Sequence, residues 1–566
     1  MNYELLMINV ARDYSSYSSC FRDSIGQYII AGYLEKFDFK AFVFSGKIED
    51  CEKEIKKAIE IDGVPVIGFY TAADNIRIVA HFIKWIKKEY PNVKTVIGGP
   101  QAIGIDYNFF KDTHLDYAIL GEGEIPTRYL LEAIVDSSRK IEEVPSLLYM
   151  NEIENILYFN EGKNVVINEL DLLPYPKLEN SLIGNLRQGP TVGIITGRGC
   201  PYKCAFCYEG ANAKNVRFRS IDNVIEEIQY ISNINKKLEY ISIYDDTFTL
   251  KKERVLEFCS KIKKLGINWF CEGHISFVNK HKEVIEEMVN SGLACIQFGI
   301  ESGSNDVLSA YNKQTDFESI LKAVKTCKEY GISGITGNFI IGGAVESRET
   351  LEDSKKLAKA LIENAKGIIE IYVVYLAPYP NTRIVNNPEK FEITLQPELE
   401  NYNLNTMRSP VVKTNKLSTK EIYEEKKNFE DFLQDIYRKA AYKPNKKDLL
   451  QGLTKDGKRI HINPTWEKYY LEQPYIAVFL DHISEEEQNF DSSKYIIRTF
   501  EDILLDDDVL RSEVGDFYGL EKEILLNATG INTAKEMALK FNVEIEEIES
   551  CYNKLNNKCL VYMSKY

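Results

Sequence analysis

Apolar segments of strand length alternate with amphipathic helical segments along two long stretches of the chain, residues 1 to about 140 and 191 to about 385. Alternation of this kind is typical of parallel sheets covered by helices. The chain is therefore predicted to be an α/β protein with two successive sheet domains.

The first stretch predicts a flavodoxin-like (Rossmann-like) domain over 1–140, where ligands bind at the carboxyl ends of the strands. The second predicts a partial (β/α)6 barrel over 191–385, with its chemical site at the same ends of its strands. The expected barrel strands are Val192–Thr196, Tyr240–Asp245, Asn268–Gly273, Ile296–Ile300, Ile335–Ile341 and Ile369–Ala377. We further expect a connector with a short hairpin over 141–190, a helical, acidic extension over 386–515 and a winged-helix-like unit over 516–566.

The charge of the chain disfavours two classes of partner. Asp and Glu number 85 against 70 Lys and Arg, a net charge of -15. Such a protein repels a phosphate backbone and an anionic membrane surface, so we expect no nucleic-acid and no membrane partner. The N-terminus reads as no export signal, and no apolar segment approaches the roughly 20 residues of a spanning helix. A cytoplasmic location is expected.

Three cysteines, Cys200, Cys204 and Cys207, follow the first predicted barrel strand with the spacing C-x3-C-x2-C. A loop this short can direct three thiolates at one centre. A structural zinc site has four protein ligands, and a redox 4Fe-4S cluster usually has four as well. Three thiolates on a cubane leave one iron open for a substrate or cofactor. The alternatives are a zinc site with a remote fourth ligand, or a chance grouping.

With this motif the central domain resembles the radical S-adenosylmethionine (SAM) enzymes, in which the open iron binds SAM and an electron cleaves it to a 5'-deoxyadenosyl radical. The resemblance implies a 4Fe-4S cluster on the three cysteines, SAM as cofactor, and an electron donor such as flavodoxin or ferredoxin. The cofactor-binding roles that it implies are Phe206 near the adenine, Asp245 and Asp246 at the methionine amine, Glu301 and Ser302 at the ribose, and Glu346 in the segment where the family often has Gly-x-Pro-Gly-Glu.

The first domain, with its glycines at strand ends, resembles the cobalamin-binding subclass of this superfamily. The expected cobalamin contacts are the backbone at Gly98, Gly99 and Gly121 and the side chains of Thr71 and Gln101. The Asp-x-His-x-x-Gly signature of many cobalamin proteins is absent, since the loop after the first strand reads Ala-Arg-Asp-Tyr-Ser-Ser-Tyr over 11–17. Cobalamin-dependent radical methylases commonly lack that histidine.

Together the resemblances imply a cobalamin-dependent radical SAM methyltransferase that methylates an unactivated carbon of a peptide or small natural-product substrate. One alternative keeps the radical chemistry but performs a rearrangement or cyclisation without methyl transfer. Another, of a different class, is a cobalamin- or peptide-binding protein with an inactive barrel. No side chain beyond the cysteines is assigned a catalytic role from the sequence.

Overall fold

The computed structural model divides into two compact units. The first is Met1–Ile320, Asn338–Ser354 and Val373–Asn428, and the second is Leu321–Gly337, Lys355–Tyr372 and Phe429–Tyr566. The structure describes residues 3–10, 24–72, 75–151, 154–160, 166–182, 189–212, 215–396, 410–442, 444, 446–456, 459–462, 464–471, 495–499, 504–506, 509–512, 515–517, 519–527, 529–557 and 561–565. Within these ranges, no helix has both the length and the apolar character that a membrane span requires.

A seven-stranded sheet of order β2-β1-β3-β4-β5-β6-β7 forms the N-terminal domain. Its strands are β1 (Leu5–Val10), β2 (Ala41–Gly46), β3 (Val66–Tyr70), β4 (Lys94–Gly98), β5 (Tyr117–Ile119), β6 (Leu147–Asn151) and β7 (Ile156–Asn160). The first five pair in parallel, whereas β6 and β7 are antiparallel. The hairpin expected in the connector therefore extends the N-terminal sheet.

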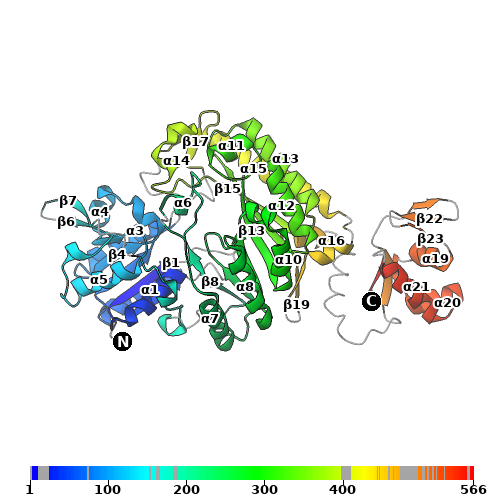
Figure 1. Cartoon of the computed structure of the whole chain (residues 1–566), viewed down its shortest axis with the longest axis horizontal. Coiled ribbons are helices and arrows are strands. Elements are labelled where there is room, and N and C mark those ends of the chain that lie inside the picture. Colours follow the sequence, from blue (N-terminus) through cyan, green and yellow to red (C-terminus); the bar gives the residue numbers. More distant parts are fainter. Residues whose placement is uncertain are drawn as a thin grey trace. The chain divides into compact units, whose positions relative to one another are not determined.

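Helices cover both faces of this sheet (Figure 1). The helices are α1 (Ile25–Glu35), α2 (Ile48–Glu60), α3 (Ile76–Glu89), α4 (Tyr107–Thr113) and α5 (Glu124–Ile134). Alternate residues of β1 enter different cores: Leu6 and Ile8 pack with α2, α3 and α4, and Leu5 and Met7 pack with α1 and α5. Burial on both faces explains why these strands are apolar throughout.

The barrel is a six-stranded sheet of order β15-β14-β13-β12-β11-β8. Its strands are β8 (Thr191–Ile194), β11 (Tyr240–Ile243), β12 (Asn268–Gly273), β13 (Leu293–Glu301), β14 (Gly334–Ile341) and β15 (Ile369–Tyr375). The helices along it are α7 (Ile221–Ile234), α8 (Lys252–Ile262), α9 (Ile275–Lys280), α10 (Lys282–Asn290), α11 (Asn305–Ala310), α12 (Phe317–Glu329), α13 (Arg348–Asn364) and α14 (Arg383–Asn386). In β12, Trp269 is fully buried against Phe248 and Phe258, whereas its neighbours Asn268 and Phe270 are less buried. This alternation separates the helix-facing side chains of the strand from those of its other face.

The C-terminal region is helical, as expected, in α15 (Thr419–Ala441), α16 (Lys446–Gln451), α17 (Pro464–Leu471), α19 (Gly519–Asn527), α20 (Ala534–Phe541) and α21 (Ile545–Asn557). The sequence did not predict its antiparallel hairpins, β16 (Ile393–Leu395) with β17 (Val412–Thr414) and β18 (Leu453–Asp456) with β19 (Arg459–Ile462). Near the C-terminus, α19, α20 and α21 share one apolar core, and β24 (Thr529–Thr533), β20 (Tyr495–Thr499) and β25 (Val561–Lys565) form a three-stranded sheet. Much of the acidic stretch 481–510 lies outside the described residues.

Candidate functional site

The three cysteines of the motif lie in the loop that follows β8. A two-stranded hairpin, β9 (Gly197–Arg198) with β10 (Arg217–Phe218), closes the base of this loop, and α6 (Tyr208–Asn212) begins directly after Cys207. All three thiols are half-buried, whereas Cys259, Cys271 and Cys327 are buried. We call residues 199–216 the cluster loop.

Backbone geometry at Gly199 fixes the start of the cluster loop. Its φ is +89°, and a Cβ there would lie 2.5 Å from the carbonyl oxygen of Asn215, so a side chain is excluded on both grounds. Its N–H donates to the Asp246 carboxylate at 2.8 Å. The Ala205 N–H donates to the Tyr311 carbonyl at 2.8 Å, which ties the middle of the loop to the barrel.

The chemistry of the thiols fits an iron–sulfur cluster. Burial raises the pKa of Cys204, and it raises that of Cys207 to about 11, so without a metal these thiols hold their protons. Metal binding must therefore release protons, since only thiolates are ligands. In the described part of the chain, no three His, Cys, Asp or Glu side chains are grouped closely enough to share one metal ion. A 4Fe-4S cubane does not require the three side chains to be grouped this closely, because each thiolate binds a different iron.

Asp245 and Asp246, expected at the methionine amine, support the backbone beneath the cluster loop. Asp245 is buried and accepts the N–H groups of Thr196 and Gly197 at 2.6 and 2.9 Å, as well as the Thr196 hydroxyl. Burial raises its pKa, and these hydrogen bonds act against that rise. Asp245 thus orders the backbone that leads into the cluster loop, and one oxygen of Asp246 is engaged by Gly199.

Two other expected residues, Glu301 and Ser302, end β13. Glu301 has a φ of +65° and is ion-paired with Lys313 at 2.8 Å, and both side chains are about a tenth exposed or less. The Ser302 hydroxyl lies 3.1 Å from that of Ser354 and accepts the Ser304 N–H, so it orders the turn. Of the two, Glu301 retains a second carboxylate oxygen for a ligand.

Phe206 and Glu346 occupy the same end of the barrel. The ring of Phe206 packs edge-on against Tyr311, with centroids 4.8 Å apart. Glu346 lies after β14, is 1% exposed and accepts the Gly342 N–H. Burial raises its pKa to about 7, although the N–H groups of Gly342 and Gly343 act to lower it.

The sequence interpretation missed Glu272 and Lys313. Burial, together with the neighbouring charges of Asp246, Asp245 and Glu301, raises the pKa of Glu272 to about 7. The available signal was a carboxylate at the end of a strand that is otherwise largely apolar, Asn-Trp-Phe-Cys-Glu-Gly over 268–273.

The predicted cobalamin contacts gather at the ends of β3, β4 and β5. A Cβ at Gly98 or Gly121 would meet no heavy atom of the described residues within 4 Å, so these residues leave space open over both glycines. Gln101 is buried in the 3-10 helix η2 (Pro100–Gly104), and among the described residues its Oε1 has no hydrogen-bond partner. An orphaned acceptor beside open glycines fits a bound polar ligand. We call this region the glycine cradle.

Other expected contacts in this region have internal partners. The Thr71 hydroxyl donates to the Gly98 carbonyl at 2.8 Å, and a Cβ at Gly99, whose φ is +100°, would lie 2.5 Å from the Thr71 carbonyl oxygen. Close backbone approach thus requires the glycine at 99. The loop 11–17, where the cobalamin signature is missing, lies outside the described residues.

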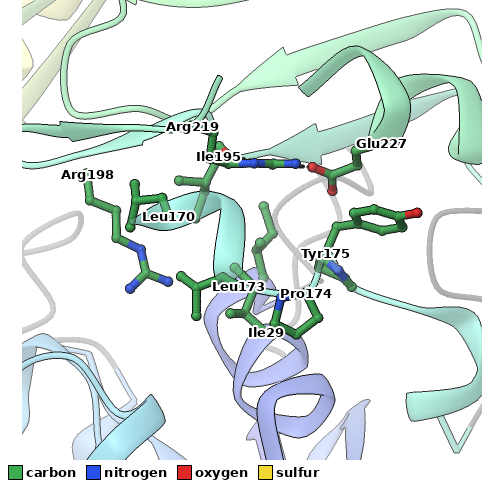
Figure 2. Close-up of a pocket in the computed structure, with 11 residues that line it drawn as sticks. Ile29, Leu170, Leu173, Pro174, Tyr175, Ile195, Arg198, Arg219 and Glu227 are labelled. Carbon is green, nitrogen blue, oxygen red and sulfur yellow. Dashed lines mark hydrogen bonds and ion pairs between the residues drawn. The ribbon is translucent and has the colours of Figure 1, made fainter. Parts of the chain in front are cut away.

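A separate cavity lies between α1, the connector and the end of β8 (Figure 2). None of the three cysteines lines it. One wall is the buried ion pair between Arg219 and Glu227, which Figure 2 marks with a dashed line. Arg198 also lines the cavity but is not part of this ion pair. The cavity therefore does not hold the cluster.

Comparison with known proteins agrees with this geometry. Residues 194–358 match the model of the Radical SAM superfamily. An uncharacterized methyltransferase of Pyrococcus horikoshii is 29% identical over 366 residues, 63% of this chain and 76% of the relative. An anaerobic magnesium-protoporphyrin IX monomethyl ester cyclase of Rubrivivax gelatinosus is 23% identical over 341 residues, 58% of this chain and 60% of the relative. The match thus spans less than two thirds of the cyclase.

Two solved enzymes share the fold. TsrM of Kitasatospora setae, a radical SAM methyltransferase solved with cobalamin and a 4Fe-4S cluster, has a TM-score of 0.56 at 16% identity over 75% of this chain and 85% of its own. OxsB, a cobalamin-dependent SAM radical enzyme solved with aqua-cobalamin and SAM, has a TM-score of 0.61 at 17% identity over 84% and 71%.

The chain contains a radical SAM domain, matched over residues 194–358. It is a radical SAM enzyme with a Rossmann-like domain ahead of the barrel, and a 4Fe-4S cluster and SAM are the cofactors that the superfamily implies. The sequence-based recognition of this class is confirmed.

Proposed function

We propose that the protein is a cobalamin-dependent radical SAM methyltransferase that methylates an unactivated carbon of a peptide or small natural product. The carrying observation is an ion pair that links the residues beside the two proposed cofactor sites: Glu122, next to Gly121 of the glycine cradle, is ion-paired at 3.0 Å with Arg198, two residues before Cys200. The word methyltransferase in the names of TsrM and of the Pyrococcus horikoshii relative supports methyl transfer.

The residues of this chain would bind and orient the reactants. Cys200, Cys204 and Cys207 would hold the cluster, which, once reduced and bound to SAM, supplies the radical that activates the substrate carbon, while cobalamin supplies the methyl group. Glu301, whose carboxylate is held by the ion pair with Lys313, would accept a ribose hydroxyl. The Gln101 amide oxygen would accept a hydrogen bond from a cobalamin amide.

Aromatic side chains shield the region after Cys207. Tyr208 packs against Tyr379 with ring centroids 6.2 Å apart, and burial raises its pKa strongly, so its hydroxyl stays protonated. In the proposed function this aromatic pair would help to keep water from radical intermediates, which is a main task that the protein performs for this chemistry.

Metal content tests the proposal first. The protein is purified anaerobically, reconstituted with iron, sulfide and hydroxocobalamin, and analysed for iron, cobalt and absorption. Four irons and about one cobalt per chain are expected. Four irons without cobalt would sink cobalamin-mediated methyl transfer, and a chain without iron would favour a binding protein with an inactive barrel.

A second function, radical rearrangement or cyclisation without methyl transfer, is favoured by the cyclase among the relatives. Methyl-labelled SAM distinguishes the two, because transfer places the label in the product. An unlabelled, isomerised product formed together with 5'-deoxyadenosine would establish the second function.

A further inference from the structure

Four charged side chains join the N-terminal domain to the base of the cluster loop. Arg198 is ion-paired with Glu122 at 3.0 Å and with Glu124 at 2.6 Å, and Arg217 is ion-paired with both oxygens of Glu122. Arg217 also donates to the Ile167 carbonyl at 2.7 Å. We call these four residues the latch.

The register of the β9–β10 hairpin makes the carboxylates necessary. Arg198 and Arg217 are directly opposite each other across the two strands. Like charges facing each other in this way destabilise a strand pair. Glu122 lies between the two guanidinium groups and accepts hydrogen bonds from both, so it converts a repulsive pair into a bridged one.

Burial makes these contacts strong. The side chains of Arg198 and Arg217 are 17% and 12% exposed, and that of Glu124 is 4% exposed. Solvent screening is weak at such sites, and removing one partner leaves an uncompensated charge in the interior. The latch is thus unlike the exposed ion pairs of the helix surfaces, which contribute little.

The latch joins the two places where cofactors are proposed to bind. Glu122 directly follows Gly121 of the glycine cradle, and Glu124 is the first residue of α5, whereas Arg198 precedes Gly199 and Cys200. We propose that Glu122 and Glu124 are positioning residues of the radical site: Glu122 bridges Arg198 and Arg217, Glu124 holds Arg198, and together they fix the cluster loop against the glycine cradle. This inference rests on the proposed function and adds residues that set the separation of its two cofactors.

Glu132 offers a matched control. It also bridges two arginines, Arg128 at 2.6 Å and Arg139 at 2.8 Å, but all three residues belong to the N-terminal domain. Its side chain is 13% exposed, between the values of 24% for Glu122 and 4% for Glu124. Glu132→Gln therefore removes an equivalent carboxylate without touching the cluster loop.

The test compares Glu122→Gln, Glu124→Gln and Glu132→Gln in the full chain reconstituted with iron, sulfide and cobalamin. The readouts are iron per chain, the electron paramagnetic resonance signal of the reduced cluster with SAM, its magnetic interaction with cob(II)alamin, and hydrogen exchange over 196–219. We expect the two latch variants to shift the cluster signal, weaken the interaction and exchange about tenfold faster over this segment. Glu132→Gln should keep the wild-type values.

Each outcome decides the inference. Loss of iron confined to the latch variants supports the inference, as a shifted cluster signal does. Recovery of the wild-type signal and iron content in Glu122→Asp, which keeps the charge, shows that the effect is not a folding defect. Unchanged signals in both latch variants, or equal changes in Glu132→Gln, would overturn it. A wild-type protein that binds no cobalt would refute the proposed function alone, because the cluster signal and the exchange rates still test the latch.

Discussion

At the scale of the residue, Glu346 should make the stability of the apoprotein depend on pH. Its pKa is raised to about 7 by burial, so between about 4.5 and 7 the folded chain holds a proton that the unfolded chain has released. The free energy of unfolding therefore falls as pH rises through this window. Glu346→Gln lacks this titrating carboxyl group. Its free energy of unfolding relative to wild type should therefore increase by about 3 kcal/mol between pH 4.5 and 8.

Thermal unfolding midpoints of wild type and Glu346→Gln at several pH values measure this difference. Parallel curves for the two proteins would show that Glu346 does not bind a proton in the folded state. Glu349→Gln is the control, because Glu349 is fully exposed and lies close in sequence. Its curve should follow that of the wild type.

The sequence located the cysteines well because their information is local. Three ligands within eight residues need no knowledge of the fold. The role of Asp245 was not readable in the same way, because its backbone partners at Thr196 and Gly197 are 49 and 48 residues away. The same holds for Lys313, because its importance depends on the ion pair with Glu301, which only the folded structure reveals.

At the scale of the element, the loop between β14 and α13 is packed against α11 through a glycine. A Cβ at Gly343 would lie 1.5 Å from the Tyr311 hydroxyl oxygen. Gly343→Ala must displace this ring, so we expect a loss of about 2 kcal/mol in stability. Because Tyr311 also contacts Phe206 and accepts the Ala205 N–H, the iron content after reconstitution should fall as well.

Gly26→Ala in α1 is the comparison for this element. A Cβ there meets no heavy atom within 4 Å, and alanine favours the helix by about 0.5–1 kcal/mol. Unfolding midpoints should therefore move in opposite directions in the two variants. An unchanged, wild-type midpoint in Gly343→Ala would mean that the β14–α13 loop accommodates the methyl group without cost.

The elements show which patterns a sequence can reveal. The strand predicted at Asn268–Gly273 is β12 with identical bounds, since its apolar pattern covers the whole strand. The β9–β10 hairpin escaped prediction because strands of two residues carry no periodicity. The β6–β7 hairpin was expected, but its pairing with β5 joins Tyr117 to Tyr149, a contact that local pattern does not specify.

At the scale of the whole molecule, the proposed cofactor sites lie on different domains and have different chemistry. The cluster depends on thiolates from one loop, whereas the glycine cradle depends on open space over the strand ends. Each site should therefore be removable without the other, although the latch joins them. This independence separates a two-cofactor enzyme from one in which a single ligand organises both domains.

Gly98→Leu and Cys204→Ala should produce opposite losses. Gly98 has open space within 4 Å of its Cβ position and no positive φ, so leucine fills the cradle without straining the backbone. Gly98→Leu should keep four irons per chain but lose its cobalt, because the space for the ligand is occupied. Cys204→Ala removes one of three ligands and should lose the iron while cobalt is retained, and Cys551→Ala should keep both metals. The iron and cobalt contents after identical reconstitution measure both effects. Loss of both metals in Gly98→Leu would mean that the cluster site depends on the glycine cradle.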